Sequence, residues 1–200
     1  MPTTIPVYFD YASSLCFIGA VLGAQLETEL DIVLDWRPVE IAAQYTGWKA
    51  GSRIDGNTRD KIARVATETG VSVVIPPRWL NSRPALEGAL LAKELGCFAE
   101  YHRRVFHAAF VDGDDIGDRY VLSRIADAAG LPIGDFMMAI ATRAHAPQLA
   151  DLLAEAATHG VTGYPTFMLG DFPLTGIQPL DTMRQLIQRY LDHRVTRMLH

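Results

Sequence analysis

Cysteine is scarce in this chain of 200 residues, which contains only Cys16 and Cys97. Two cysteines are too few for the disulfide scaffold of a small secreted protein, and they suit a reducing compartment. Residues 1–6 also lack the basic flank and the long apolar run of a secretory leader. The sequence therefore predicts a cytoplasmic protein.

An excess of positive charge is missing as well. The chain has 18 Lys and Arg against 23 Asp and Glu, which gives a formal net charge of -5. Nucleic acids and anionic membranes both bind basic surfaces, so we expect neither as a partner. No stretch approaches the roughly 20 apolar residues of a membrane span, which argues against a transmembrane protein.

Metal-ligand spacing is also absent. The six histidines are scattered along the chain, and the nearest pair, His102 and His107, is five residues apart. This pattern does not supply the closely spaced ligands of a zinc site, so we expect no bound metal.

The composition that is present is that of a folded globular protein. Hydrophobic residues make up 49% of the chain and charged residues 20%, without a low-complexity tract. A chain of this length can bury a substantial core. The sequence alone does not decide between a monomer and a homodimer.

Residues 7–19 are the stretch around which the rest is organised. An apolar, aromatic run of strand character turns within a few small residues into a segment with helical spacing. Ser13 and Ser14 are N-cap candidates, so free backbone N–H groups of the helix are expected beside Ser13. Cys16 follows Ser13 by three residues, which gives S-x-x-C where a redox site has C-x-x-C.

A second stretch, residues 160–170, places Pro165 immediately before a short strand-like run with glycines on either side. Proline cannot donate a backbone hydrogen bond, so it is found at the start or edge of a strand. In a tight turn its peptide bond is sometimes cis.

Hydrophobic periodicity predicts the remaining elements. A strand over residues 31–37 forms a right-handed βαβ unit with the first strand and helix. From about residue 39 to 160 the pattern is helical, apart from an extended stretch at 71–77, and Asn57 and Asp118 are expected as N-caps. The helices expected there cover residues 57–69, 83–95, 98–110, 118–129, 133–142 and 147–158. A hairpin of residues 166–169 and 172–175 and a helix over 181–193 complete the chain.

Together, the S-x-x-C turn and the Gly-Tyr-Pro-Thr-Phe segment resemble the DsbA-like proteins of the thioredoxin-fold family, over nearly the whole chain. The likeness is to FrnE-type oxidoreductases, 2-hydroxychromene-2-carboxylate isomerases and kappa-class glutathione transferases. Four further segments support this likeness by their order and spacing, namely residues 36–38, 81–86, 110–118 and 176–179. The resemblance implies an α/β fold with a thioredoxin-like core of residues 1–38 and 161–200. A helical domain, residues 39–160, is inserted between its βαβ and ββα halves.

The resemblance implies catalytic roles for Ser13 and Cys16. Ser13 stands where oxidoreductase relatives have the attacking cysteine and glutathione-using relatives have a serine. A serine cannot form a disulfide, so dithiol exchange between the two positions is excluded. Its hydroxyl can instead donate a hydrogen bond to the thiolate of bound glutathione, or it is only a helix cap. Cys16 is either a reactive thiol or, more simply, a buried hydrophobic residue.

We expect the substrate to contact six residues around this turn, namely Tyr11, Ser14, Trp36, Tyr164, Pro165 and Gln178. Tyr164 and Pro165 resemble the family's cis-proline loop, whose free backbone edge can pair with an extended peptide or with glutathione. The alternative is an ordinary trans proline at a strand edge. Gln178 lies where glutathione-using relatives carry a Ser-Asp pair, so the acidic group that holds an ammonium is absent.

Further polar and aromatic candidates for the rim of a cleft are Asp10, Arg37, Trp48, Arg53, Asn57 and Asn81. An aromatic and arginine-rich rim suits a planar organic acid, although surface packing explains such residues equally well.

Two hypotheses about function follow. In the first, the protein is a DsbA-family oxidoreductase-like enzyme that has lost dithiol exchange and acts on thiol or glutathione adducts, as a transferase or isomerase. Its partners are then a small-molecule thiol, with glutathione as cofactor, and an electrophile. In the second, it is a non-catalytic module that binds an extended peptide along the Tyr164 backbone edge.

Overall fold

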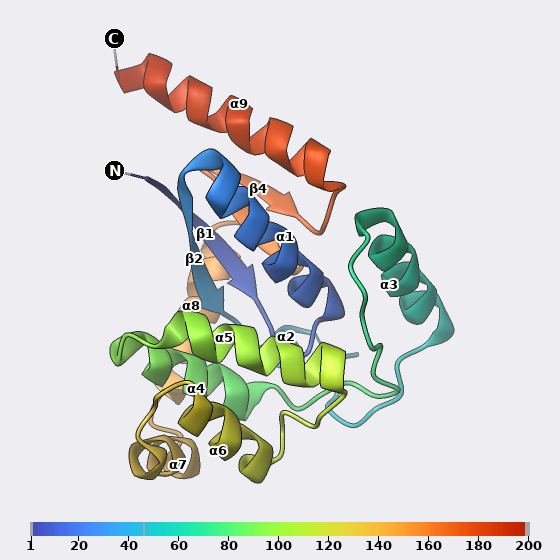
Figure 1. Cartoon of the computed structure of the whole chain (residues 1–200), viewed down its shortest axis with the longest axis vertical. Coiled ribbons are helices and arrows are strands. Elements are labelled where there is room, and N and C mark those ends of the chain that lie inside the picture. The colour runs from blue at the N-terminus through green and yellow to red at the C-terminus, as the bar shows by residue number, and fades with distance from the viewer. Residues whose placement is uncertain (1, 46, 199–200) are drawn as a thin grey trace.

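The structure is a computed structural model that describes residues 2–45 and 47–198. The outer limits of the expected core, residues 1 and 200, lie outside the described residues. A four-stranded sheet runs through the molecule (Figure 1), formed by β1 (Thr3–Phe9), β2 (Ile32–Pro38), β3 (Thr166–Leu169) and β4 (Phe172–Thr175). The strand order is β2-β1-β3-β4, with β1 and β2 parallel and the other neighbouring pairs antiparallel.

The helices expected from periodicity are present, with ends that differ by a few residues. They are α1 (Ser14–Leu30), α3 (Gly56–Thr69), α4 (Arg83–Glu94), α5 (Phe98–His107), α6 (Arg119–Ala128), α7 (Ile133–Thr142), α8 (Ala146–Thr158) and α9 (Leu180–Met198). The structure adds a short helix, α2 (Ile41–Gln44), and a π-helical turn, η1 (Ala108–Asp112), after α5.

Two details differ from the sequence-based expectation. Asn57 is not an N-cap, because Asp55 caps α3 by accepting a hydrogen bond from the Thr58 N–H. Residues 71–77, expected as an extended stretch between helices, contain no helix and no strand in the described chain. The short helix α2 escapes detection because its four residues are fewer than helical periodicity needs. The expected N-cap at Asp118 is confirmed.

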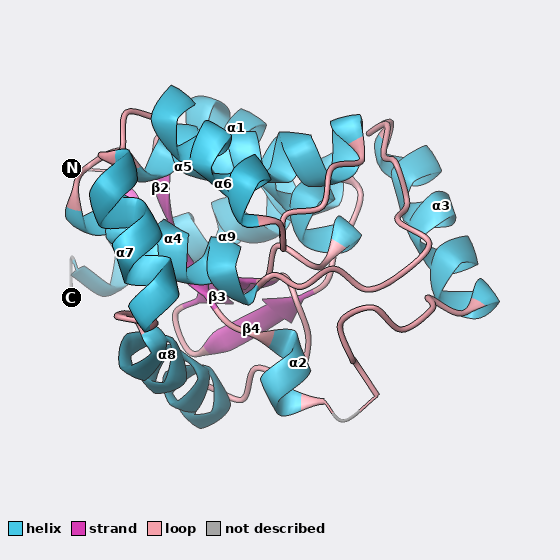
Figure 2. Ribbon diagram, turned by 90° about the horizontal axis from the view of Figure 1, so that it is seen from below, coloured by secondary structure: helices cyan, strands magenta, loops and turns pink. Residues whose placement is uncertain are grey.

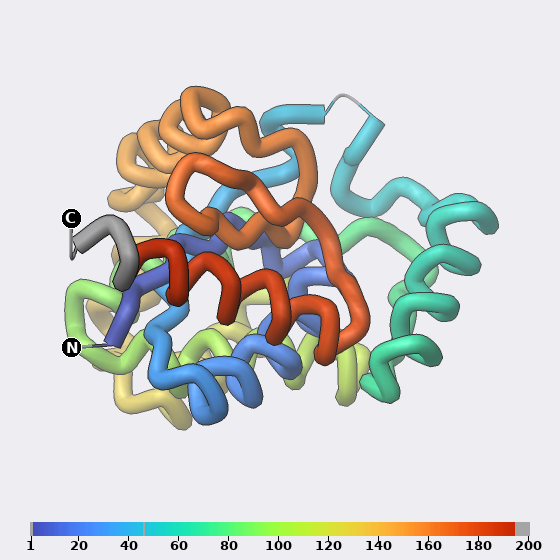
Figure 3. The backbone as a smooth tube through the Cα atoms, turned by 90° about the horizontal axis from the view of Figure 1, so that it is seen from above, coloured from blue at the N-terminus to red at the C-terminus, as the bar shows by residue number. Residues whose placement is uncertain are grey.

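The βαβ unit positions the start of α1 at one end of the sheet. Asp31 adopts a left-handed conformation, with φ of 49°, and ends α1 so that β2 returns parallel to β1. Gly23 allows α1 to lie close to β2, because a Cβ there would come within 2.7 Å of Leu34 Cδ1. Seen from above, α9 crosses the molecule alongside α1 (Figure 3).

The two faces of the sheet are covered by helices from different parts of the chain. Figure 2 shows α1 on one side of the strands and α8 on the other. Tyr8 points from β1 toward α8, where its hydroxyl donates to Glu155 Oε1 at 2.6 Å. If Tyr8 donates to Glu155, its contact at 2.8 Å with His159 must be donated by the Nδ1–H of the histidine. These bonds hold α8 to the sheet.

Candidate functional site

Ser13 is the N-cap of α1, as its position in the sequence predicts. Its backbone is extended, with φ of -98° and ψ of 113°, and its Oγ accepts a hydrogen bond from the Cys16 N–H at 3.2 Å. The first turn of α1 carries no acidic side chain. Because the amides of that turn point toward the cap, the Ser13 end of α1 has a positive potential. An anion placed against Ser13 is therefore stabilised by the helix as well as by the hydroxyl.

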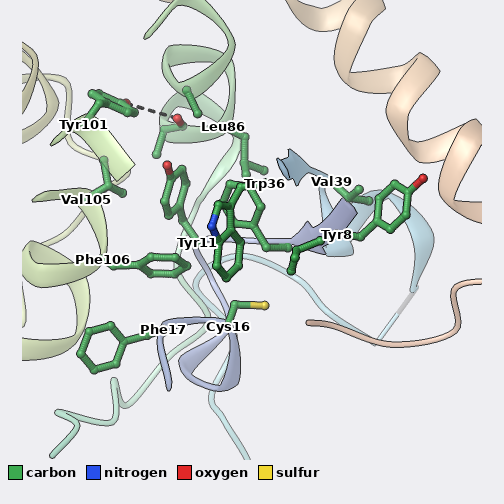
Figure 4. Packing of buried hydrophobic residues seen from close by; sticks show 14 of the residues in the cluster. Tyr8, Tyr11, Cys16, Phe17, Trp36, Val39, Leu86, Tyr101, Val105 and Phe106 are labelled. Carbon is green, nitrogen blue, oxygen red and sulfur yellow. Dashed lines mark hydrogen bonds between the residues drawn. The ribbon is translucent and has the colours of Figure 1, made fainter. Parts of the chain in front are cut away.

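Cys16 lies inside the hydrophobic core and has no exposed surface. It belongs to a cluster of buried residues that also includes Phe17, Trp36 and Val39 (Figure 4). Burial raises the pKa of this thiol to about 12, although a hydrogen bond with the Ser13 side chain acts in the opposite direction. A neutral, enclosed thiol is a poor nucleophile. Of the two readings of Cys16, the structure supports that of a packing residue.

Pro165 and Ser13, far apart in the sequence, belong to segments that meet in the fold. The Tyr164–Pro165 peptide bond is cis. Pro165 packs on the N-terminal half of α1 at Gly19, where a Cβ would lie 3.1 Å from Pro165 Cγ. The glycine thus allows the loop of residues 162–165 to approach the turn that carries Ser13.

A cavity of about 280 Å³ opens between these two segments. Its lining contains three of the expected site residues, Ser13, Ser14 and Tyr164. The other lining residues are Leu15, Ile41, Tyr45, Trp48, Thr58, Lys61, Ile62, Trp79, Thr162 and Gly163. Of these, only Trp48 is a candidate from the sequence. They come mainly from α2, α3 and the loops around them, and only their assembly in space identifies them.

The short helix α2 joins the two walls of this cavity. The Tyr164 hydroxyl donates to Gln44 Oε1 at 2.6 Å, and the Tyr45 hydroxyl donates to the Thr162 carbonyl, also at 2.6 Å. At its other end, the Ile41 N–H donates to the Asp10 carboxylate at 2.7 Å. Asp10 also accepts a hydrogen bond from the Ala12 N–H at 2.8 Å. The Ser13 turn and the Tyr164 loop are therefore held at a fixed separation.

Tyr11 and Trp36 do not reach this cavity, which corrects their assignment as substrate-binding residues. Tyr11 is completely buried, and its hydroxyl is hydrogen-bonded at 3.0 Å to His102 Nδ1. Trp36 packs its ring against Phe9 and His102 in the same aromatic cluster. Both rings pack against side chains of the neighbouring helix α5, which covers them.

His102 was not expected from the sequence to matter for the site. Burial lowers its pKa to about 3, so the ring is neutral. Its Nε2 has no hydrogen-bond partner within the described part of the chain. Through Tyr11, this histidine connects α5 to the turn that carries Ser13.

Gln178 is exposed and does not line the cavity, although the neighbouring Ile177 packs against Gly19. The side chain that was expected to replace the family's acidic residue therefore lies outside the pocket wall. Pro165 is buried and does not line the cavity, although it directly follows Tyr164, which does.

Within residues 2–45 and 47–198, no group of three or more His, Cys, Asp or Glu side chains is arranged to hold a metal ion. In the same part of the chain, no helix is both long and apolar enough to cross a membrane.

A family model described as the DSBA-like thioredoxin domain matches residues 4–188. The chain belongs to this family. Its four-stranded mixed sheet with covering helices is the thioredoxin-like α/β fold that the sequence predicts. This is the DsbA-like thiol-disulfide oxidoreductase and isomerase family, which is the broad class that the resemblance of the sequence predicts.

Among curated proteins, the chain is similar to the uncharacterized protein YwbO of Bacillus subtilis (strain 168). The two are 29% identical over 200 residues, which cover 94% of this chain and 96% of YwbO.

Two solved structures show the same fold. One is a 2-hydroxychromene-2-carboxylate isomerase, with a TM-score of 0.78 and 20% identity, covering 98% of this chain and 97% of the isomerase. The other is the cytosolic disulfide reductase DsbM from Pseudomonas aeruginosa with GSH. It has a TM-score of 0.66 and 19% identity, and the alignment covers 98% of this chain and 100% of DsbM.

The burial of Cys16 predicts a difference in alkylation between the two cysteines. In the native protein at about pH 8, iodoacetamide should modify the half-buried Cys97 at least about 100-fold faster than Cys16, because a buried thiol with a raised pKa is almost entirely protonated. Peptide mass mapping over time measures both rates. In guanidinium chloride both cysteines should react, and native modification of Cys16 at the rate of Cys97 would contradict the assignment.

The buried carboxyl group of Asp10 predicts a pH-dependent stability. Burial raises its pKa from 3.8 to about 6, despite the hydrogen bonds from Ala12 and Ile41. The folded state then binds a proton more tightly than the unfolded state. The stabilisation from this proton is complete below about pH 4 and is lost as the pH rises through 6, an effect of about 3 kcal/mol.

The variant Asp10→Asn cannot titrate at this position and serves as the matched reference. Urea unfolding of both proteins at several pH values measures the difference, in which the contributions of the other carboxyl groups cancel. The wild type should lose stability relative to Asp10→Asn by about 3 kcal/mol between about pH 4 and pH 7. A constant difference across that range would show that Asp10 has an ordinary pKa.

Proposed function

We propose that the protein is an enzyme that binds a small thiol, such as glutathione, and uses its thiolate on an electrophilic substrate, as a transferase or isomerase. The observation that carries this proposal is the Ser13 hydroxyl, which caps α1 and lines a cavity shared with Tyr164. The proposal assigns Ser13 to thiolate activation, and Ser14 and Tyr164 to binding.

The mechanism needs no change of redox state. Ser13 Oγ accepts from the Cys16 N–H. With the neutral Cys16 thiol as the donor in its own hydrogen bond to Ser13, the Ser13 O–H remains to be donated to a sulfur atom in the cavity. That hydrogen bond and the N-terminal potential of α1 lower the pKa of the bound thiol, whose proton leaves to solvent. The thiolate then adds to the electrophilic carbon of a conjugated C=C bond, whose π electrons move to the activating group, and that group takes a proton from solvent. Transfer ends with the new C–S bond intact, and isomerisation ends when it breaks and the thiol is released.

Dithiol chemistry is not available to this turn. Exchange needs two sulfur atoms, and the S-x-x-C turn contains one, which is buried. The thioredoxin-like relatives that use glutathione thus offer a better parallel than those with two cysteines. The structure of DsbM was solved with GSH, which is consistent with a thiol ligand in this fold.

A reducing compartment suits this chemistry, because it keeps the thiol ligand reduced. Cys16 and Cys97 are both free, as expected of a cytoplasmic protein. We therefore retain the cytoplasm as the proposed location.

The second candidate function is peptide binding without catalysis. It is favoured by one observation, that none of the hydrogen bonds among described residues engages the backbone N–H or C=O of Tyr164. This edge is available to pair with an extended peptide, as an additional strand. Such binding depends on the backbone of Tyr164 and is independent of the Ser13 hydroxyl.

Replacing Ser13 separates the two functions. Glutathione at about ten times its dissociation constant should stabilise the wild type by about 1.4 kcal/mol and raise Tm by about 4 °C. Ser13→Gly should lower turnover of an electrophilic test substrate by about 100-fold, because the hydrogen bond to the thiolate is lost. Glycine is tolerated at an N-cap within a few tenths of a kcal/mol, so the variant should fold.

The control is Ser72→Ala, which changes an exposed serine outside the cavity and should leave both measurements unchanged. A wild type whose Tm does not respond to millimolar glutathione would contradict thiol binding. Unchanged turnover in Ser13→Gly would contradict the role of the hydroxyl. Thiol-independent binding of extended peptides, unaffected by Ser13→Gly, would favour the second function.

A further inference from the structure

The charge of the cavity wall restricts which thiols can bind. Among the described residues that line the cavity, Lys61 is the only charged one. No aspartate or glutamate lies in that lining, so the wall has a single positive charge. A bound group with negative charge is favoured there, and a bound ammonium has no anionic partner.

Lys61 is available to such a ligand. It is exposed on α3, one helical turn beyond Thr58, which also lines the cavity. It forms no ion pair with any described residue. Asp60 precedes Lys61 on α3, but adjacent residues of a helix do not face each other. Asp55, at the start of the helix, is occupied as the N-cap by two hydrogen bonds from Thr58.

The other distinctive part of the wall is apolar. Trp48 and Trp79 are stacked, with ring centroids 3.7 Å apart and an interplanar angle of 26°. Together with Leu15 and Ile62 they give the cavity an apolar side that suits an acyl or aromatic group. The sulfur atom binds beside Ser13, where the positive potential of the start of α1 stabilises a thiolate.

We infer that the cavity selects thiols whose cysteinyl nitrogen is acylated, so that no ammonium group lies beside the sulfur, with Lys61 binding a carboxylate. Glutathione is such a thiol, because its ammonium group lies at the far end of its γ-glutamyl residue. This inference rests on the proposed function, since it takes the sulfur to lie against Ser13. The carboxylate pairs with the Lys61 ammonium, and the acyl group packs on the Trp48–Trp79 stack. Free cysteine and other aminothiols are rejected because their ammonium is desolvated without a partner.

Three small thiols that differ in one group test this selection. N-acetylcysteine has the carboxylate and no ammonium, N-acetylcysteamine lacks the carboxylate, and cysteine adds the ammonium. Quenching of tryptophan fluorescence, to which Trp48 and Trp79 contribute, gives each dissociation constant. We expect N-acetylcysteine to bind about fivefold more tightly than N-acetylcysteamine and about tenfold more tightly than cysteine.

The variant Lys61→Met keeps the length of the side chain and removes its charge. It should abolish the advantage of N-acetylcysteine over N-acetylcysteamine, whereas Lys61→Arg should retain it. Lys49→Met is the matched control, because Lys49 is exposed and outside the cavity lining. Since Lys61 is exposed, the variants should fold like the wild type, which thermal melting verifies.

The outcomes separate this inference from the proposed function. If all three thiols bind equally well, or if Lys61→Met leaves their ratios unchanged, the selection is overturned and thiol binding itself stands. If none of the thiols binds to the wild type, both the proposed function and the selection are overturned.

Discussion

The site depends on the packing of Pro165 against Gly19 of α1. This contact joins the N-terminal βαβ unit to the C-terminal hairpin. The hairpin strand β3 starts directly after Pro165 and pairs with β1. It brings the backbone of Tyr164 beside the N-terminus of α1, where Ser13 supplies a hydroxyl. A side chain at Gly19 larger than hydrogen would push the loop away, since its Cβ would meet Ile177 Cδ1 at 3.0 Å and Pro165 at 3.1 Å.

The position of α2 beside the cavity is fixed by polar contacts. The Asp10 carboxylate links the Ser13 turn to α2, and Gln44 links α2 to the Tyr164 hydroxyl. The resulting arrangement favours an anionic sulfur at α1 and an apolar body against the two stacked tryptophans. Loss of the first cysteine of the turn is thus compatible with a preserved pocket, in which the sulfur comes from a ligand.

Much of the fold could be predicted from the sequence, because local signals agree with tertiary structure there. Ser13 and Asp118 are N-caps as expected, and the βαβ unit and the final hairpin follow their hydrophobic periodicity. The cavity wall could not be predicted, because irregular loops determine where α3, which carries Lys61, and the segment with Trp79 lie in space. Tyr11 and Trp36 look like cleft residues in the sequence, and only the position of α5 shows that they are buried.

The most direct test of the account is the pKa of the thiol of bound glutathione, measured from its ultraviolet thiolate absorbance as a function of pH. The account predicts a value at least about one unit below that of free glutathione in the wild type, and a return toward the free value in Ser13→Gly. A bound thiol with an unshifted pKa in the wild type would contradict the claim that Ser13 and the start of α1 activate it.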